Sequence, residues 1–142
     1  MSQTNELEIM ERIALDLEHV EESLASSFNT GAEDFNALIR PLSAAGGKRL
    51  RAQLCLLIAN AGTSIERQRI KIAEAVEMLH LATLIHDDVL DQAEIRRGED
   101  TIHMHKGNKV AILSGDYLFA KAFKIVSEMT NMKYLQVFSH II

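Results

Sequence analysis

The chain has 142 residues, of which 47% are hydrophobic and 25% are charged, and its formal net charge is −5. This length and composition predict one globular domain, residues 1–142, and exclude general disorder. The acidic balance gives no electrostatic basis for a nucleic-acid surface, and no apolar run is long enough for a transmembrane segment.

One proline and seven glycines are few breakers for a chain rich in Leu, Ala and Glu, which favours long helices. Apolar residues repeat at three- and four-residue steps, the period of one helix face. The predicted helices span residues 6–28, 33–45, 48–61, 64 to about 95, 108 or 109 to 129, and 133–142. We expect Pro41 to interrupt the second helix and Gly46-Gly47 to end it, while Thr63 or Ser64 caps the fourth. The sequence therefore predicts an all-α fold of about five or six helices.

The single cysteine, Cys55, cannot form an internal disulfide, and it lies in an apolar run that suits a small core residue. The N-terminus is polar and acidic and lacks the features of a signal peptide. We therefore expect a cytoplasmic protein.

The fourth predicted helix carries acids in a segment that otherwise has the composition of a core. Asp87 and Asp91 share a helix face with His80, Asp88 lies beside that face, and Glu77 is nearby. Carboxylates at this spacing repel one another unless a cation lies between them. Oxygen ligands suit Mg²⁺, or Mn²⁺ in its place, better than Zn²⁺. The alternative is a solvated acidic face.

Two basic clusters flank these acids. Lys48 and Arg51 share a face at a helix start that follows two glycines, where backbone N–H groups attract anions. Arg96-Arg97 follows the acids and forms a second basic rim. Each cluster alone could be a solvent-facing group of charges, but beside the acids we interpret both as a clamp for phosphate.

Two features stay open. Asp116 either lines the cavity or accepts a hydrogen bond beside a helix-packing glycine, Gly115. Because no cysteine or paired spacing supports a zinc site, we interpret His86, His103 and His105 as surface or turn residues.

Linked motifs in this order and spacing closely resemble trans-polyprenyl diphosphate synthases. They are Gly46-Gly47-Lys48-Arg49-Leu50-Arg51, Glu77-Met78-Leu79-His80, Asp87-Asp88-Val89-Leu90-Asp91, Arg96-Arg97-Gly98 and Ser114-Gly115-Asp116-Tyr117-Leu118. The resemblance covers the chain from about Pro41 to at least Ala122. It implies an incomplete helical bundle of the isoprenoid synthase type and a prenyltransferase that condenses isopentenyl diphosphate with an allylic prenyl diphosphate.

The resemblance also implies roles for individual residues. Asp87, Asp88 and Asp91 would be the catalytic ligands of Mg²⁺ on the allylic diphosphate, which Arg96 would steady. The residues that would hold isopentenyl diphosphate are Lys48, Arg51, His80 and Arg97. The small residues Ala82 and Thr83 stand where bulky side chains stop chain growth in this family, which implies a long product, with Phe119 or Phe123 as a lower wall.

The sequence departs from the family in lacking a second Asp-rich motif, and its end at residues 134–142 is apolar and uncapped. We expect a truncated or split chain that needs a complementary half, and association into a homo- or hetero-oligomer. The alternatives are a regulatory or stabilising subunit of a full-length synthase, and a fragment of an ordinary homodimeric enzyme.

Overall fold

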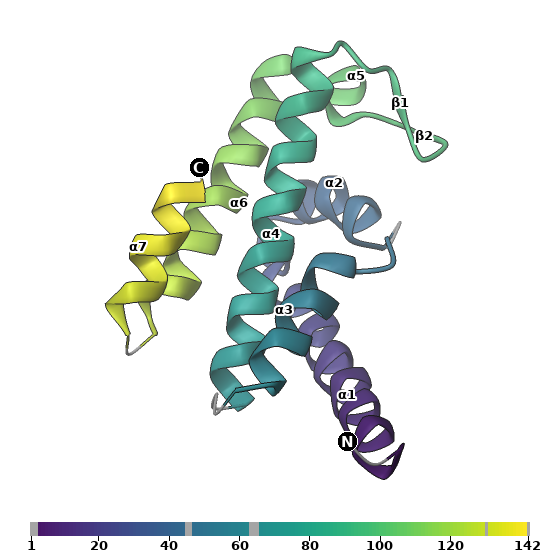
Figure 1. The fold of residues 1–142 in the computed structure, drawn as a ribbon. Helices are drawn as coiled ribbons and strands as arrows, with labels where there is room; N and C mark the ends of the chain where they lie inside the picture. The colour runs from purple at the N-terminus through teal and green to yellow at the C-terminus, as the bar shows by residue number, and fades with distance from the viewer. Residues whose placement is uncertain (1–2, 45–46, 63–65, 130, 142) are drawn as a thin grey trace.

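The computed structural model describes residues 3–44, 47–62, 66–129 and 131–141. Within these ranges the chain forms seven helices and one two-stranded hairpin (Figure 1). The elements are α1 (Gln3–Ser27), α2 (Glu33–Ala44), α3 (Leu50–Asn60), α4 (Glu66–Leu90), β1 (Ile95–Arg96), β2 (Glu99–Asp100), α5 (Ile102–Lys106), α6 (Asn108–Ser127) and α7 (Met132–Ile141). The predicted all-α fold is confirmed, whereas the hairpin and the five-residue helix α5 were not predicted. The predicted breaker Gly46 and the predicted caps Thr63 and Ser64 lie outside the described residues.

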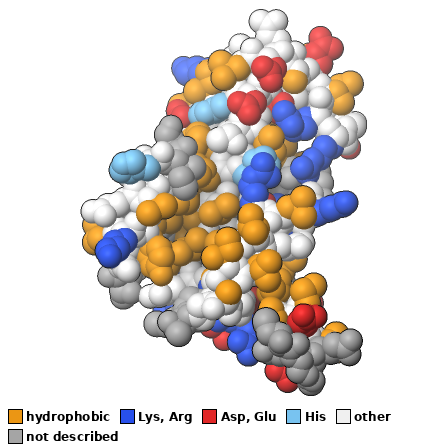
Figure 2. Space-filling view, in the orientation of Figure 1, with side chains coloured by type: hydrophobic (Ala, Val, Ile, Leu, Met, Phe, Trp, Pro, Cys, Tyr) orange, Lys and Arg blue, Asp and Glu red, His pale blue; other side chains and the backbone are white. Residues whose placement is uncertain are grey.

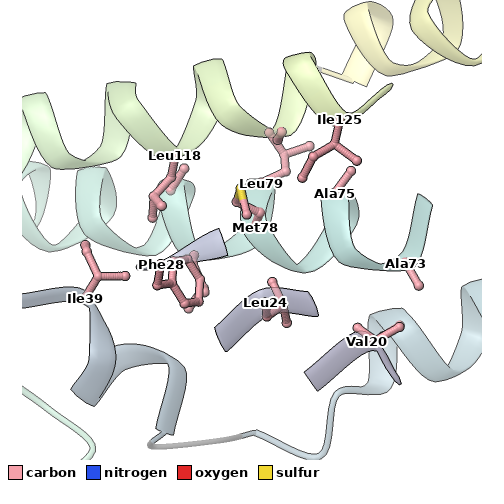
Figure 3. Close-up of a cluster of buried hydrophobic side chains, with 14 of the residues drawn as sticks. Val20, Leu24, Phe28, Ile39, Ala73, Ala75, Met78, Leu79, Leu118 and Ile125 are labelled. Atoms are coloured by element: carbon pink, nitrogen blue, oxygen red, sulfur yellow. The ribbon is translucent and has the colours of Figure 1, made fainter. Parts of the chain in front are cut away.

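Helix α4 is the central element of the fold. It lies along α6, its most extensive neighbour, and also packs against α3 and α1 (Figure 1). Figure 3 shows Met78 and Leu79 of α4 in the middle of a buried cluster, with side chains of α6 on one side and of α1 on the other. Each large apolar side chain buried in this way stabilises the fold by about 1.5–3 kcal/mol. Because α4 is covered from several directions, its apolar residues extend around most of its circumference.

Hydrogen bonds to a buried carboxylate and a buried ion pair fix α1 against α4. The carboxylate of Glu74 is fully buried and accepts hydrogen bonds from the hydroxyls of Ser23 and Ser27, each at 2.7 Å. The Arg69 guanidinium donates to both oxygens of Asp16, at 2.6 and 3.0 Å. These pairs satisfy charges that would otherwise destabilise the core.

The expected break at Pro41 and the boundaries of two predicted helices are wrong in informative ways. Helix α2 continues through Pro41 to Ala44, because Pro41 and Ala37 lie on the exposed side, where water can solvate the carbonyl that the proline leaves unpaired. Helix α3 begins at Leu50 and not at residue 48. Helix α4 ends at Leu90, and Gln92 has a left-handed φ of 53° that ends it five residues before the predicted limit.

No helix among the described residues is both long and apolar enough to span a bilayer. At the C-terminal side, α7 packs on α6 through an edge-to-face contact between Phe138 and Phe123, whose ring centroids are 5.6 Å apart.

Candidate functional site

The acidic motif lies at the end of α4. The backbone N–H of Asp91 donates to the carbonyl of Asp87 at 2.8 Å, so one further helical turn places both exposed side chains on the same side. Asp88 differs, because it is buried and its carboxylate accepts a hydrogen bond of 2.7 Å from Nε of Arg96. The motif therefore presents two open carboxylates, and the third is engaged with a cation of this chain.

The three aspartates do not form a preassembled metal cage. Among the described residues, a group of three possible metal ligands with ligand atoms within 4.8 Å of one another occurs elsewhere, at Asp16, His19 and Glu66. Asp16 already forms an ion pair with Arg69. We therefore interpret this group as structural. Asp87 and Asp91 lie on one side of α4, whereas Asp88, which was expected beside that face, points to Arg96.

The hairpin separates its two arginines. Arg97 and Gly98 occupy the two-residue turn between the strands, with φ of 54° and 88°, as in a type I′ turn. A non-glycine residue rarely adopts such a φ, and it persists where the surroundings fix it. Arg96 thus points to Asp88, whereas the Arg97 guanidinium reaches back to the loop before α3. A Cβ added to Gly47 would lie 3.2 Å from Nη2 of Arg97, so the glycine permits this close approach.

A cationic cavity lies between α3, α4 and the hairpin. It has a volume of about 180 Å³. The charged or titratable residues that line it are Lys48, Arg49, Arg51, Glu77, His80 and Arg97. The structure thus brings together all four residues expected to hold isopentenyl diphosphate, although they come from three separate segments of the chain.

The surroundings of His80 shift its pKa. Burial lowers its pKa below the ordinary 6.5, and the positive charge of Arg51 lowers it further, while Glu77 acts in the opposite direction. At neutral pH the imidazole is therefore uncharged and can donate or accept a hydrogen bond. An anion entering the cavity would offset the nearby cations and raise this pKa.

A buried network that sequence reasoning missed supports the loop before α3. Arg49, with a left-handed φ of 46°, donates to both oxygens of Glu21 at 2.5 and 3.1 Å. Its Nη1 lies 3.6 Å from Glu77, which also accepts the N–H of Ala52 at 3.0 Å. Glu77 was expected near the acidic face, but it lies in the core beneath the cavity. A glutamate between the apolar residues Val76 and Met78 was the available signal.

The residues expected to set chain length lie in different environments. Ala82 is fully buried in the core. Thr83 is exposed on the same side of α4 as Asp87, one turn earlier, and its hydroxyl donates to the carbonyl of His80 at 2.8 Å. Because Ala82 cannot contact a ligand without opening the core, Thr83 is the accessible position. Phe119 and Phe123 lie one turn apart on α6 and are half-buried.

Figure 2 shows one face of the molecule, on which acidic and basic side chains lie next to one another in the upper part, above a band of hydrophobic side chains. A second cavity, of about 380 Å³, lies between α2, α4 and the hairpin. It shares Leu42, Leu81, Leu84 and Arg97 with the cationic cavity. Polar groups for an anion and apolar surface for a hydrocarbon are thus adjacent.

Comparison with known proteins agrees with this arrangement. The chain is 33% identical over 140 residues to solanesyl diphosphate synthase 1 of Arabidopsis thaliana, a match that covers 94% of this chain and 34% of the relative. It is 39% identical to heptaprenyl diphosphate synthase component 2 of Geobacillus stearothermophilus, covering 86% and 38% of the two chains. The chain therefore spans little more than a third of the length of these relatives.

A solved structure of polyprenyl synthase from Caulobacter crescentus, complexed with calcium and isoprenyl diphosphate, matches with a TM-score of 0.86 and 35% identity. That match covers 93% of this chain and 40% of the other. The sequence profile described as polyprenyl synthetase matches residues 32–142, which is most of the chain. The chain belongs to the polyprenyl synthetase family.

Proposed function

We propose that this chain supplies, in one domain, the part of a trans-prenyltransferase active site that binds both diphosphates. The product would be a polyprenyl diphosphate, made from isopentenyl diphosphate and an allylic diphosphate once a complementary half is present. The observation that carries the proposal is the divergence of adjacent arginines: Arg96 lies at the Asp motif and Arg97 at the cationic cavity. One hairpin thus serves two anion sites.

The Asp motif fits a divalent cation. Asp87 and Asp91 offer exposed carboxylate oxygens on one side of α4 and leave room for phosphate oxygens and water, as Mg²⁺ or Mn²⁺ requires. When bound there, the cation would stabilise negative charge on the leaving pyrophosphate. Asp88, buried against Arg96, would act by orienting that arginine toward the same diphosphate. The catalytic and metal-binding roles are therefore proposed for Asp87 and Asp91 directly and for Asp88 through Arg96.

The cationic cavity fits the diphosphate of isopentenyl diphosphate. Lys48, Arg51 and Arg97 supply positive charge, and neutral His80 supplies a hydrogen bond. The bond between the allylic carbon and oxygen breaks with its electron pair on pyrophosphate. The isopentenyl double bond would then attack that carbon, and transfer of a proton to the released pyrophosphate would form the new double bond. The chain's cations favour this step by holding both diphosphates in position and stabilising the charge that departs.

An exposed apolar surface favours an assembly. Large apolar side chains are exposed on α3, including Leu54, Leu57 and Ile58. A complementary chain, or a homo- or hetero-oligomer, would cover such surface.

The free thiol of Cys55 is compatible with the reducing cytoplasm.

The test is isopentenyl incorporation by the chain mixed with a polypeptide that carries the second Asp-rich motif of a full-length relative. We expect product from the mixture and none from either part. Asp87→Ala with Asp91→Ala should abolish product. Product from the unmodified mixture and none from the mixture that contains the variant would support the proposal. Absence of product from the unmodified mixture would contradict it.

The second candidate is a regulatory or stabilising subunit. It is favoured by the relative whose name calls it component 2 of a synthase, because that name implies an enzyme of more than one chain. In that case a full-length partner should gain activity or stability from this chain, and the gain should persist when Asp87 and Asp91 are both replaced by Ala.

A further inference from the structure

We propose that His86 and Gly115 form a lock between α4 and α6 that sets the direction in which Asp87 and Asp91 project. His86 is then a positioning residue, which acts on the metal site without contacting the metal. The inference rests on the proposed metal-binding role of the two aspartates. It also corrects the sequence-based interpretation of His86 as a surface or turn residue, because its ring lies between two helices.

The His86 ring of α4 packs directly against Gly115 of α6. A Cβ added to Gly115 would lie 2.2 Å from Nε2 and 2.4 Å from Cδ2 of His86. Real Cβ atoms do not approach other atoms this closely, so only glycine leaves space for the imidazole. Gly115 is therefore a helix-packing glycine, as one of the two alternatives for Asp116 expected, whereas the Asp116 side chain itself is exposed.

Hydrogen bonding fixes the ring within this space. Nε2 of His86 lies 3.0 Å from the backbone carbonyl of Ile112 on α6. A carbonyl oxygen only accepts, so Nε2 carries the hydrogen and donates it. The ring also packs against Phe119, at 5.4 Å between centroids. The carboxylate of Asp116 lies 3.6 Å from Nε2, which is too far for a hydrogen bond. The imidazole is therefore held by steric fit and by a directed bond.

The lock controls the acids because His86 directly precedes Asp87 and α4 ends only four residues later, at Leu90. Successive side chains on a helix differ in direction by a fixed rotation, so the angle of His86 determines the angles of its neighbours. The side chains of Asp87 and Asp91 make no hydrogen bond to the part of the chain that the structure describes. The last turn of α4 is instead fixed by Asp88, which bonds Arg96 on the hairpin, and by His86, which bonds α6.

The experiment compares two calorimetric titrations of the 142-residue chain. Pyrophosphate with Mn²⁺ reports the Asp motif, and pyrophosphate with chelator reports the cationic cavity. Gly115→Ala should weaken Mn²⁺-dependent binding by about tenfold to a hundredfold, the range seen when groups that orient metal ligands are lost. Binding in chelator should stay unchanged. Gly62→Ala is the matched control, because the nearest atom to its added Cβ is 3.8 Å away.

Two further variants separate positioning from folding. His86→Ala removes the hydrogen bond without a clash, so the chain should stay helical by circular dichroism while Mn²⁺-dependent binding weakens. In His86→Ala with Gly115→Ala the clash is absent. Its melting temperature should exceed that of Gly115→Ala, and its metal binding should remain weak.

The outcomes distinguish the lock from the function on which it rests. The lock would be overturned if Gly115→Ala bound pyrophosphate with Mn²⁺ as tightly as the wild-type chain, or if the double variant regained the full wild-type affinity. Either result would leave the proposed function intact. Absence of Mn²⁺-dependent binding by the wild-type chain would overturn the metal role and the lock together.

Discussion

Replacing Glu77 by Ala tests whether the cationic cavity depends on the buried network beneath it. Glu77 is 3% exposed, lies 3.6 Å from Nη1 of Arg49 and accepts the N–H of Ala52. Removing one member of a buried pair destabilises a protein by about 3–5 kcal/mol. Arg49 keeps both bonds to Glu21, so we expect the lower end, about 3 kcal/mol. Glu77→Gln keeps an acceptor for Ala52 and removes only the charge, and should cost about 1.5 kcal/mol.

The assay is urea unfolding followed by circular dichroism, together with pyrophosphate binding in chelator. Glu77→Ala should bind pyrophosphate more weakly, because the start of α3 loses its support. Glu94→Ala is the matched control, since Glu94 is exposed and surface substitutions change stability by about 0.5 kcal/mol or less. If Glu77→Ala were as stable as this control and bound pyrophosphate normally, the structural role assigned to the network would be refuted.

Three further predictions concern other parts of the site. Arg96→Ala leaves Asp88 buried without its partner, so thermal unfolding should show a loss of about 1.5–3 kcal/mol, and an unchanged melting temperature would contradict the pairing. Because the pKa of His80 is lowered in the folded chain, the unfolded chain binds more protons, and stability should fall as pH drops through about 6.5. Comparison with His80→Gln isolates this loss, and equal slopes in the two proteins would exclude it. In a complemented active enzyme Thr83→Phe should shorten the product on chromatography, whereas Ala82→Phe should overpack the core and cost about 1–3 kcal/mol. Unchanged product length in Thr83→Phe would exclude Thr83 as a residue that limits chain growth.

Local patterns predicted the helices. Apolar periodicity identified α1, α4 and α6, because these helices bury one or more faces against the rest of the fold. Such periodicity depends on short-range geometry, which a sequence determines directly. The grouping of Lys48, Arg51, His80 and Arg97, which line one cavity, came from the resemblance to a family and not from local spacing.

What sequence could not predict depends on tertiary contacts. The direction of the Asp88 side chain is set by Arg96. That arginine lies on a hairpin that the sequence did not predict, because its two strands are too short to show an alternation of apolar and polar residues. The buried position of Glu77 depends on Arg49 from another segment, and the interhelical place of His86 depends on a glycine in α6. Pro41 was expected to break a helix, but propensity is overridden where solvent can satisfy the freed carbonyl.

The proposed pair of diphosphate sites is tested most directly by calorimetric titration of the chain with pyrophosphate, first in chelator and then with excess Mg²⁺. We expect two classes of site from this proposal: one that needs no metal and is lost in Arg97→Ala, and one that appears only with Mg²⁺ and is lost in Asp87→Ala. A single class of site, insensitive to Mg²⁺ and lost equally in both variants, would contradict it.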